Sequence, residues 1–424
     1  MATAQGSRLY ATAALGAEDL VAAELRRLGF TGVTRAGGGV EFDAGPAGPL
    51  ATGMRACLHL RIAARVLLPL ATFPATDADT LYDGVRAVAW EEWMVPERTF
   101  AVHATTGAEP PLAHSPFLAQ RTKDAVVDRL RERQGARPDV AKDAPDVLLY
   151  LHVAQARGKT PSVTVGLDVG GGSLHRRGYR VTEGAAPLRE TLAAAVVAAT
   201  GWPANPSRPF VDPMCGSGTL AIEAAMVALE LAPGLIGRET RGRRFGFERW
   251  PGFGDAERTN WTRLLDEARG AVRATAPGPI IASDRDPDAV AQARLCAAAA
   301  GAGVAGVIDF RVADVRAFAA MTPPASIVTN PPYGERMGGS ATALEGFWRG
   351  LSWHLRTLDG HTAFILCGSP EMTAAVGIRP AWERRFMNGP LPVILARFEL
   401  GRQAPPRARG ARGARGARGS GEQR

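Results

Sequence analysis

The stretch RPFVDPMCGSGTLAIEAAMVALE, residues 208 to 230, holds the pattern that decides the fold. A short apolar run ends at Asp212, a turn with Gly216 and Gly218 follows, and an apolar segment then has the length of a helix. Small residues in such a turn let a ligand approach the backbone, and the start of the next helix offers free amides to an anion. The stretch predicts a strand, a ligand-binding turn and a helix.

Similar units recur further along the chain. A strand, an acidic turn and a helix are predicted for residues 279–301, a strand and an acidic turn for residues 307–318, and one more strand for residues 324–334. Repeated βα units of this length predict a parallel sheet with helices on both faces. Ligands of such α/β sheets bind at the carboxyl ends of the strands.

Each predicted strand ends in polar side chains. Asp284 and Asp286 follow the second strand, where a carboxylate can accept both hydroxyls of a ribose. Asp314 follows the third and suits an adenine amino group, and Asn330 ends the fourth. Taken singly, aspartates in these places are often helix N-caps, which is the role we favour for Asp286 before a proline. Their order along one sheet edge favours a nucleotide-type site.

Bulk composition describes an ordinary globular protein. The 424 residues are 46% apolar, 22% charged and 7% aromatic, enough for two or three domains. No apolar run approaches the roughly 18 residues of a membrane span, and the first residues lack a signal-peptide layout, which predicts a cytoplasmic protein. The four cysteines are far apart and form no cluster with histidine, which argues against structural zinc and a disulfide framework.

The positive charge is concentrated in a tail. Residues 402 to 424 hold seven arginines and one glutamate, a balance of +6 out of a net charge of +8. Its RARGARGARGARGSGEQR part, residues 407–424, has no apolar residue larger than alanine, and we expect residues 401–424 to be disordered. It acts either as a solubilising end or as a weak RNA contact through phosphate neutralisation.

The first half of the chain reads as an α+β module. Residues 16–30 predict a helix with Val21 and Leu25 in its core, and SPFLAQRTKDAVVDRLRERQG predicts a basic amphipathic helix. Phe117 is a candidate core residue of that helix, and Arg121 and Lys123 are candidate RNA contacts. At the glycine-rich junction before the βα units, Arg176, Arg177 and Arg180 either pair with RNA phosphates or form an interdomain salt-bridge hinge.

Several motifs resemble one enzyme family. DPMCGSGT, SDRDPDAVAQAR, ADV and NPPYGER look like the cofactor and catalytic motifs of class I methyltransferases that use S-adenosylmethionine and modify an exocyclic amine. With FAVHATTG, SLHRRGYR and NGPL, the chain to about residue 400 is similar to the THUMP-domain RNA guanine-N2 methyltransferases of the bacterial large-subunit rRNA type. The single-domain form that the resemblance implies performs one methylation.

The resemblance implies a domain organisation and site residues. The domains are a ferredoxin-like region (1–60), a THUMP domain (61–170), a linker (171–187) and a Rossmann-like methyltransferase domain (188–400), in a monomer. Cofactor contacts are implied for Asp212, Cys215, Gly216, Gly218, Thr219, Asp284, Asp314 and Asn330, although Cys215 also reads as a small packing residue. Catalysis is implied for Asn330, Pro331, Pro332 and Tyr333, without a metal.

Three other interpretations stay open. The target amine is on tRNA in relatives with the same layout. An NPPY enzyme can also methylate adenine in DNA or glutamine in protein, which would leave the long N-terminal half without a purpose. A third alternative is a non-enzymatic RNA-binding assembly factor, whose mark would be loss of Asp284, the glycine turn or Asn330, and all of these are intact.

Overall fold

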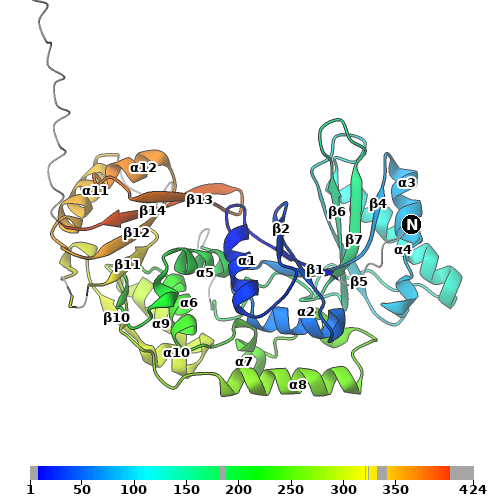
Figure 1. The fold of residues 1–424 in the computed structure, drawn as a ribbon, viewed down its shortest axis with the longest axis horizontal. Coiled ribbons are helices and arrows are strands. Elements are labelled where there is room, and N and C mark those ends of the chain that lie inside the picture. Colours follow the sequence, from blue (N-terminus) through cyan, green and yellow to red (C-terminus); the bar gives the residue numbers. More distant parts are fainter. Residues whose placement is uncertain (1–7, 182–187, 320, 323, 332–340, 402–424) are drawn as a thin grey trace, which may run out of the picture.

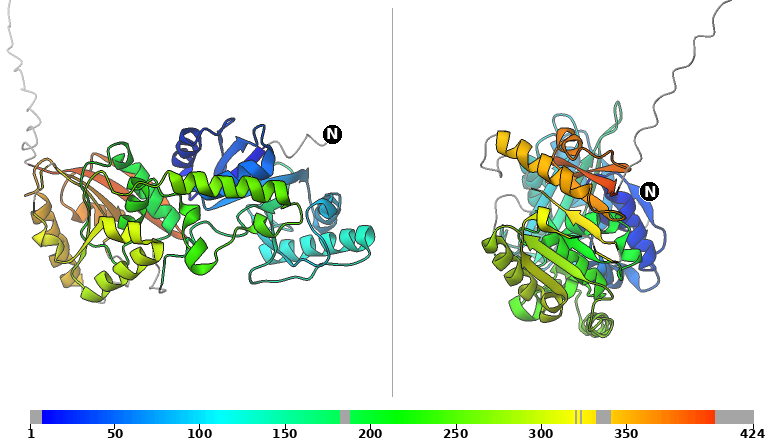
Figure 2. Two further views of the ribbon diagram at one scale, coloured as in Figure 1. Left: turned by 90° about the horizontal axis from the view of Figure 1, so that it is seen from below. Right: turned by 90° about the vertical axis from the view of Figure 1, so that its left-hand side faces the viewer.

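The computed structural model describes residues 8–181, 188–319, 321–322, 324–331 and 341–401. This part of the chain forms two seven-stranded sheets, one in each half (Figure 1). The two halves lie end to end along the long axis of the molecule (Figure 2). The expected architecture, a Rossmann-like α/β domain preceded by an α+β region, is confirmed.

The first sheet has the order β2-β3-β1-β4-β7-β6-β5 and is antiparallel except for the β5–β6 pair. Its strands are β1 (Arg8–Thr12), β2 (Thr34–Ala36), β3 (Gly39–Asp43), β4 (Arg65–Pro74), β5 (Phe100–Thr106), β6 (Val147–Ala154) and β7 (Ser162–Asp168). Leu67 of β4 pairs with Tyr10 of β1 on one side and with Asp168 of β7 on the other. The ferredoxin-like and THUMP regions therefore share one continuous sheet.

Four main helices accompany this sheet: α1 (Glu18–Arg27), α2 (Gly48–His59), α3 (Ala78–Arg86) and α4 (Ser115–Gln134). Val21 and Leu25 of α1 are fully buried as predicted, and Gly29 follows the helix with a φ of 78° that suits glycine. The prediction of Phe117 as a core residue of α4 is wrong, because its neighbour Leu118 is buried instead and Phe117 is 42% exposed. The buried face of α4 consists of Leu118, Thr122, Ala125, Val126 and Leu130.

The second sheet has the order β10-β9-β8-β11-β12-β14-β13. Its strands are β8 (Phe210–Asp212), β9 (Ile280–Asp284), β10 (Ile308–Val312), β11 (Ser326–Thr329), β12 (Thr362–Cys367), β13 (Trp382–Asn388) and β14 (Leu391–Glu399). The first five in spatial order are parallel, and β14 and β13 are antiparallel additions. The four predicted βα strands are all present, which confirms the parallel sheet.

Helices cover both faces of the second sheet, since successive strand residues alternate between two cores. Phe210 and Ala282 belong to the core that includes α5 (Glu190–Ala199), α6 (Thr219–Ala228) and α9 (Pro287–Ala300). Val211 and Ile281 belong to the core that includes α11 (Ala341–Leu355). Two short helices, α10 (Ala302–Val307) and α12 (Pro370–Ala375), complete the layers.

A segment between α6 and β9 joins the two halves. It contains η3 (Pro233–Leu235), α7 (Arg238–Arg241), η4 (Gly246–Arg249) and α8 (Asp255–Gly270). The amide of Gly246 donates to the carbonyl of Gly170 at 2.9 Å, just after β7. A Cβ on Gly246 would lie 2.5 Å from Cα of Gly171, so the two backbones touch where only glycine fits. Trp250 adds an edge-to-face contact with Trp93, 6.2 Å between ring centres.

A buried ion pair lies at the same seam. Arg177, 1% exposed, is 2.9 Å from Glu223 of α6 and also donates to the carbonyl of Arg61 in the first half. The hydroxyl of Tyr179 donates to Glu223 at 3.0 Å. Arg61 in turn donates to the carbonyl of Leu231 at 2.9 Å. Charged groups this deep persist only when they are paired, so the network fixes the two halves relative to each other.

Candidate active site

The polar residues predicted at the strand ends lie along one edge of the second sheet. Asp212 and Asp284 are the last residues of β8 and β9, Asp314 follows β10, and Asn330 follows β11. Because these four strands are parallel neighbours, their carboxyl ends share an edge. Residues up to 118 positions apart in sequence are thus brought together.

The turn after β8 has the predicted form. Gly216 and Gly218 have φ angles of 49° and 78°, in the left-handed region where glycine is favoured. The amide of Cys215 donates to the carbonyl of Ser283 at 2.9 Å, which fixes the turn against the end of β9. Thr219 is the first residue of α6 and is buried. Burial raises the pKa of the Cys215 thiol, so Cys215 is a neutral packing group.

Asp284 connects the turn to the second strand end. Its carboxylate accepts hydrogen bonds from the amide of Gly216 at 3.0 Å and from the amide of Asp286 at 3.1 Å. Asp286 accepts from the amide of Asp288 at 2.9 Å and is the N-cap of α9, which confirms the favoured interpretation of that residue. Asp284 is left as the carboxylate that faces the glycine turn.

Asp212 is tied to the strand that carries Asn330. The hydroxyl of Thr329 donates to the carboxylate of Asp212 at 2.9 Å, and both side chains are buried. The β8–β11 ladder ends at the pair Ile327 and Val211, so this side-chain bond continues the pairing beyond it. Burial raises the pKa of Asp212 to about 7, and the Thr329 hydroxyl partly opposes that rise. Sequence reasoning missed Thr329, whose only signal is a polar residue inside an apolar strand.

Asn330 presents an acceptor that is unpaired among the described residues. Its side-chain oxygen Oδ1 is buried and accepts no hydrogen bond from the residues that the structure describes. A buried polar atom left unpaired costs about 1–3 kcal/mol, so such atoms invite a functional explanation. Pro331, directly after it, is buried. Pro332 and Tyr333, the other two predicted catalytic residues, lie outside the described residues.

Asp314 is held in its charged form. Arg316 forms an ion pair with it at 2.6 Å, and the backbone amide of Arg316 donates to the same carboxylate at 2.8 Å. The Arg316 guanidinium lowers the pKa of Asp314 to about 2. Asp314 therefore remains an ionised acceptor throughout the neutral range, at the edge position expected for an adenine contact.

The predicted RNA contacts on α4 are partly engaged within the protein. Arg121 pairs with Asp79 of α3 at 2.7 Å, donates to the carbonyl of Ala78 and lies 4.4 Å above the ring of Tyr82. Lys123 is half-buried on the same helix. The interactions of Arg121 hold α3 against α4, which is the ordinary structural role of a basic helix face.

The three junction arginines separate into different roles. Arg176 is exposed. The RNA contact predicted for Arg177 is corrected, because its guanidinium is buried against Glu223 and has no access to an RNA phosphate. Arg180 pairs with Glu190 at 3.3 Å and donates to the carbonyl of Leu188 at 2.9 Å, so it fastens the junction to α5. The salt-bridge alternative holds for the last two.

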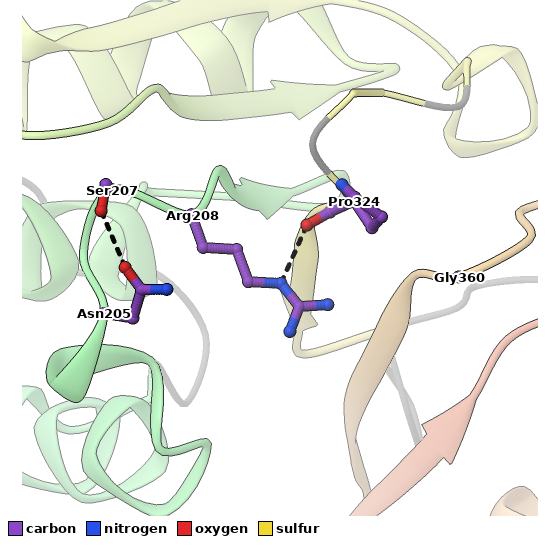
Figure 3. A pocket seen from close by; sticks show the side chains of 5 residues that line it. All are labelled: Asn205, Ser207, Arg208, Pro324 and Gly360. Atoms are coloured by element: carbon purple, nitrogen blue, oxygen red, sulfur yellow. Dashed lines mark hydrogen bonds between the residues drawn. The ribbon is translucent and has the colours of Figure 1, made fainter.

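A surface pocket of about 400 Å³ lies at the opposite edge of the sheet (Figure 3). Its lining residues are Asn205, Ser207, Arg208, Pro324 and Gly360, next to the amino ends of β8, β11 and β12. Arg208 donates to the carbonyls of Pro324 at 2.8 Å and Ala325 at 3.2 Å. These hydrogen bonds hold Arg208 against the residues just before β11. Because the pocket lies at the amino ends of the strands, it is separate from the polar edge at their carboxyl ends.

The described residues also bear on metal binding, disulfides and membrane-spanning helices. Within the described ranges, no group of three or more His, Cys, Asp and Glu side chains is placed to hold a metal ion. All four cysteines are buried free thiols. A search of the helices in the described ranges finds none with the length and apolarity to cross a membrane.

Comparison with protein families divides the chain into three matches. Residues 8–67 match the RlmL ferredoxin-like domain, residues 75–157 match the THUMP domain, and residues 177–396 match the RMKL-like methyltransferase domain. The methyltransferase match covers the whole polar edge of the second sheet. The THUMP match covers α3, α4, β5 and β6.

Curated relatives share most of the chain. It is 40% identical over 405 residues to the ribosomal RNA large subunit methyltransferase K/L of Syntrophotalea carbinolica, covering 93% of this chain and 54% of that protein. The chain thus spans about half the length of the K/L relatives it matches. It is 36% identical to the putative RNA methyltransferase slr0064 of Synechocystis sp., covering 92% of this chain and 96% of that protein.

Solved structures agree over the same length. SMU.472, a putative methyltransferase complexed with SAH, is 30% identical with a TM-score of 0.79, covering 95% of this chain and 100% of that one. A predicted N6-adenine-specific DNA methylase from Listeria monocytogenes is 30% identical with a TM-score of 0.78, covering 93% of this chain and 96% of that one. This chain therefore belongs to the RMKL-like methyltransferase family whose members carry a THUMP domain and an RlmL-type ferredoxin-like domain.

Proposed function

We propose that this protein transfers a methyl group from S-adenosylmethionine to the exocyclic N2 amine of a guanine in large-subunit, 23S-type rRNA. The observation that carries the proposal is the buried Oδ1 of Asn330 at the polar edge of the second sheet, which has no hydrogen-bond partner among the described residues. The rRNA substrate is supported by the names of the K/L relatives and by the THUMP match.

The polar edge fits the cofactor. A Cβ at Gly216 would meet nothing within 4 Å, so there is open space beside the turn for a ligand to approach the backbone. Asp284, next to it, offers carboxylate lone pairs to ribose hydroxyls, and Asp314 offers an ionised acceptor to an adenine amino group. When bound, S-adenosylmethionine supplies an electrophilic methyl group. Asp212, Cys215, Gly218 and Thr219 complete the proposed contact set.

Asn330 prepares the amine. The lone pair of a guanine N2 amine is delocalised into the ring, which makes the nitrogen a poor nucleophile. Asn330 Oδ1 would accept one N–H and the carbonyl of Pro331 the other, which takes the lone pair out of conjugation and localises it on the nitrogen. The nitrogen would gain the methyl as the methyl–sulfur bond breaks and a neutral thioether leaves, and would lose a proton to water, because an amide oxygen is too weak a base to keep it.

Rigidity supports this role. The ring of Pro331 fixes its φ angle, and the Thr329–Asp212 bond holds the strand just before Asn330. The acceptor is thus placed before the base arrives, which is the arrangement that lowers the reorganisation needed for reaction. Pro332 belongs to the proposed catalytic set, and the proposed role of Tyr333 is to stack on a base extruded from its RNA helix or loop. A monomer in the cytoplasm, where rRNA is assembled, completes the proposal.

Product analysis tests the reaction. Purified protein is incubated with S-adenosylmethionine carrying a deuterated methyl group and with deproteinised 23S rRNA, 16S rRNA, bulk tRNA, genomic DNA or cell protein. Nucleosides and amino acids are then identified by mass spectrometry. One labelled N2-methylguanosine per 23S rRNA molecule is the expected product.

Each other product selects an alternative. Labelled guanosine found only in tRNA would replace the rRNA assignment with a tRNA one. Labelled adenine in DNA or labelled glutamine in protein would change the substrate class. DNA is included because the similar Listeria protein is named a predicted N6-adenine-specific DNA methylase. Binding of rRNA without any product would favour a non-enzymatic assembly factor.

A further inference from the structure

Two segments run side by side where the first half meets the second. Arg180, from the junction, reaches the carbonyl of Leu188 at 2.9 Å and the carboxylate of Glu190 at 3.3 Å, at the start of α5. Arg241 of α7 donates to the carbonyl of Arg180 at 3.4 Å. The junction segment around Arg180 and the first turn of α5 are therefore one connected surface.

This surface lies at the catalytic edge of the second sheet. The β13–β14 turn holds Gly389, and β14 pairs antiparallel with β12 so that Ile394 is opposite Cys367, the last residue of β12. Gly389 is thus beyond the carboxyl end of β12, on the same side as Asn330. A Cβ on Gly389 would lie 3.3 Å from Nη2 of Arg189, so Arg189 is at that edge as well.

Two arginines of this surface carry uncompensated charge. Of four arginines whose charge acts on His175, Arg65 pairs with Asp168 and Arg180 pairs with Glu190. Arg176 and Arg189 are exposed, and neither has an ion-pair partner among residues 8–181, 188–319 and 341–401 or the shorter described stretches between them. Among the described residues, no carboxylate therefore neutralises either guanidinium group.

His175 does not add to the charge near neutral pH. Burial, followed by the charges of Arg189 and Arg176, lowers the pKa of His175 to about 4. Its ring is 2.5 Å from the hydroxyl of Ser173, which holds it in place. The cluster therefore presents a constant positive charge from Arg176 and Arg189 across the working pH range.

We propose that Arg176 and Arg189 form a phosphate clamp, which grips the RNA backbone at the catalytic edge beside the nucleotide that enters the site. The guanidinium fork matches phosphate oxygens in geometry and charge. The junction position means that a strand held by the THUMP half passes the clamp before it reaches Asn330. The clamp rests on the proposed function for its RNA substrate, and it names two residues that hold the backbone rather than read the base.

Salt-dependent binding tests the clamp. Arg176→Gln, Arg189→Gln and the double variant are compared with wild type for binding of a fluorescent 23S rRNA fragment between about 50 and 300 mM salt. Each single change is expected to weaken binding roughly fivefold and to reduce the slope of log affinity against log salt by about 0.7–0.9. The double variant loses about twice that slope. Cofactor affinity and melting temperature stay at the wild-type values.

A matched control separates a clamp from general charge loss. Arg35→Gln removes an exposed arginine from β2, an edge strand of the first sheet, and is expected to leave the slope unchanged. The clamp is overturned if the double variant binds with the wild-type slope, or if Arg35→Gln reduces the slope equally. Failure of the guanine assignment would appear instead as absence of N2-methylguanosine with wild-type protein, whatever the binding slopes.

Discussion

The two seven-stranded sheets use polar residues in opposite ways. In the second sheet, five parallel neighbours end at one edge, and Asp212, Asp284 and Asn330 gather there. In the first sheet, antiparallel neighbours end at alternating edges, so polar strand ends have no common place to meet. Several of its charged groups instead form ion pairs within the protein, such as Arg121 with Asp79 and Arg65 with Asp168.

This difference separates two classes of residue. Site residues lie at the parallel edge of the second sheet, and joints are charged residues that pair with another part of the protein. We expect replacement of a residue at the parallel edge to change binding or chemistry, because we propose that it contacts a ligand. A paired residue in the first half or at the seam changes stability, because its partner is another part of the protein. The substitutions below test this division by measuring stability and activity on the same variants.

The largest effect is expected at the seam. Arg177→Met leaves Glu223 buried without its cation and should lower the free energy of unfolding by about 3–5 kcal/mol. Denaturant unfolding measures the change. The neighbouring Arg176→Gln, on an exposed side chain, is the matched control and should leave stability unchanged.

A second variant keeps that prediction testable if Arg177→Met does not fold. Arg177→Met combined with Glu223→Leu removes both charges and should recover most of the lost stability, because no buried charge remains unpaired. If Arg177→Met were as stable as wild type, the seam would not depend on this pair.

The next largest effect concerns the reaction rate. Asn330→Ala should slow methyl transfer by roughly a hundredfold or more, about 2.7 kcal/mol, because it removes a preorganised acceptor. Cofactor affinity should stay within about twofold of wild type, and unfolding should be unaffected. Asn205→Ala, at the opposite edge of the same sheet, is the control and should keep the full rate. A slow Asn205→Ala or a fast Asn330→Ala would contradict the edge assignment.

Asp284→Ala should act on binding rather than rate. Loss of the carboxylate removes charged hydrogen bonds to the ribose and the tie to the amide of Gly216, so cofactor affinity should fall by about 1.5–3 kcal/mol while RNA affinity is kept. Calorimetry with S-adenosylmethionine measures it. Asp286→Asn keeps the N-cap of α9 and should bind the cofactor normally. Normal binding by Asp284→Ala would move the ribose contact elsewhere.

The sequence predicted the place of a residue best where the chain topology determines that place. In βα units, a residue after a strand is placed by the strand direction alone, so the positions of Asp212, Asp284, Asp314 and Asn330 on one edge could be predicted. The partner of a surface or junction arginine depends on tertiary neighbours. The three arginines of HRRGYR are close in sequence, yet Arg176 is exposed, Arg177 is buried against Glu223 and Arg180 pairs with Glu190. For the same reason the burial of Leu118 in place of Phe117 on α4 and the role of Thr329 were not predictable.

A pH-dependent effect is expected within the site. Burial raises the pKa of Asp212 to about 7 in the folded protein, above its unfolded value, so the folded state holds this proton more tightly. The cost of ionising Asp212 therefore grows as pH rises from about 4 to 7 and is complete above 7. Asp212→Asn keeps an oxygen for the Thr329 hydroxyl but carries no charge.

The measurement is the difference in unfolding free energy between Asp212→Asn and wild type, without cofactor. It should increase in favour of the variant from pH 5 to pH 8 and level off above that. A difference independent of pH would mean that Asp212 is ionised throughout this range.

The smallest effect is expected on α4, and it sharpens the comparison from the other side. Arg121→Gln breaks an ion pair with Asp79, whose side chain is highly exposed, and such pairs contribute about 0–1 kcal/mol. Because Arg121 is occupied by α3, its loss should change rRNA affinity by less than about twofold, whereas Arg189→Gln in the same assay provides a positive reference.

Lys123→Gln removes a charge from the same helix without breaking the Arg121–Asp79 ion pair. It therefore distinguishes the two possible origins of any loss of affinity. If Lys123→Gln weakens binding and lowers the salt slope by about 0.7–0.9 while Arg121→Gln does not, α4 touches RNA through Lys123 and not through Arg121. If both weaken binding as strongly as Arg189→Gln, the first half contributes charged contacts of its own, and the division between joints and site residues fails on this helix.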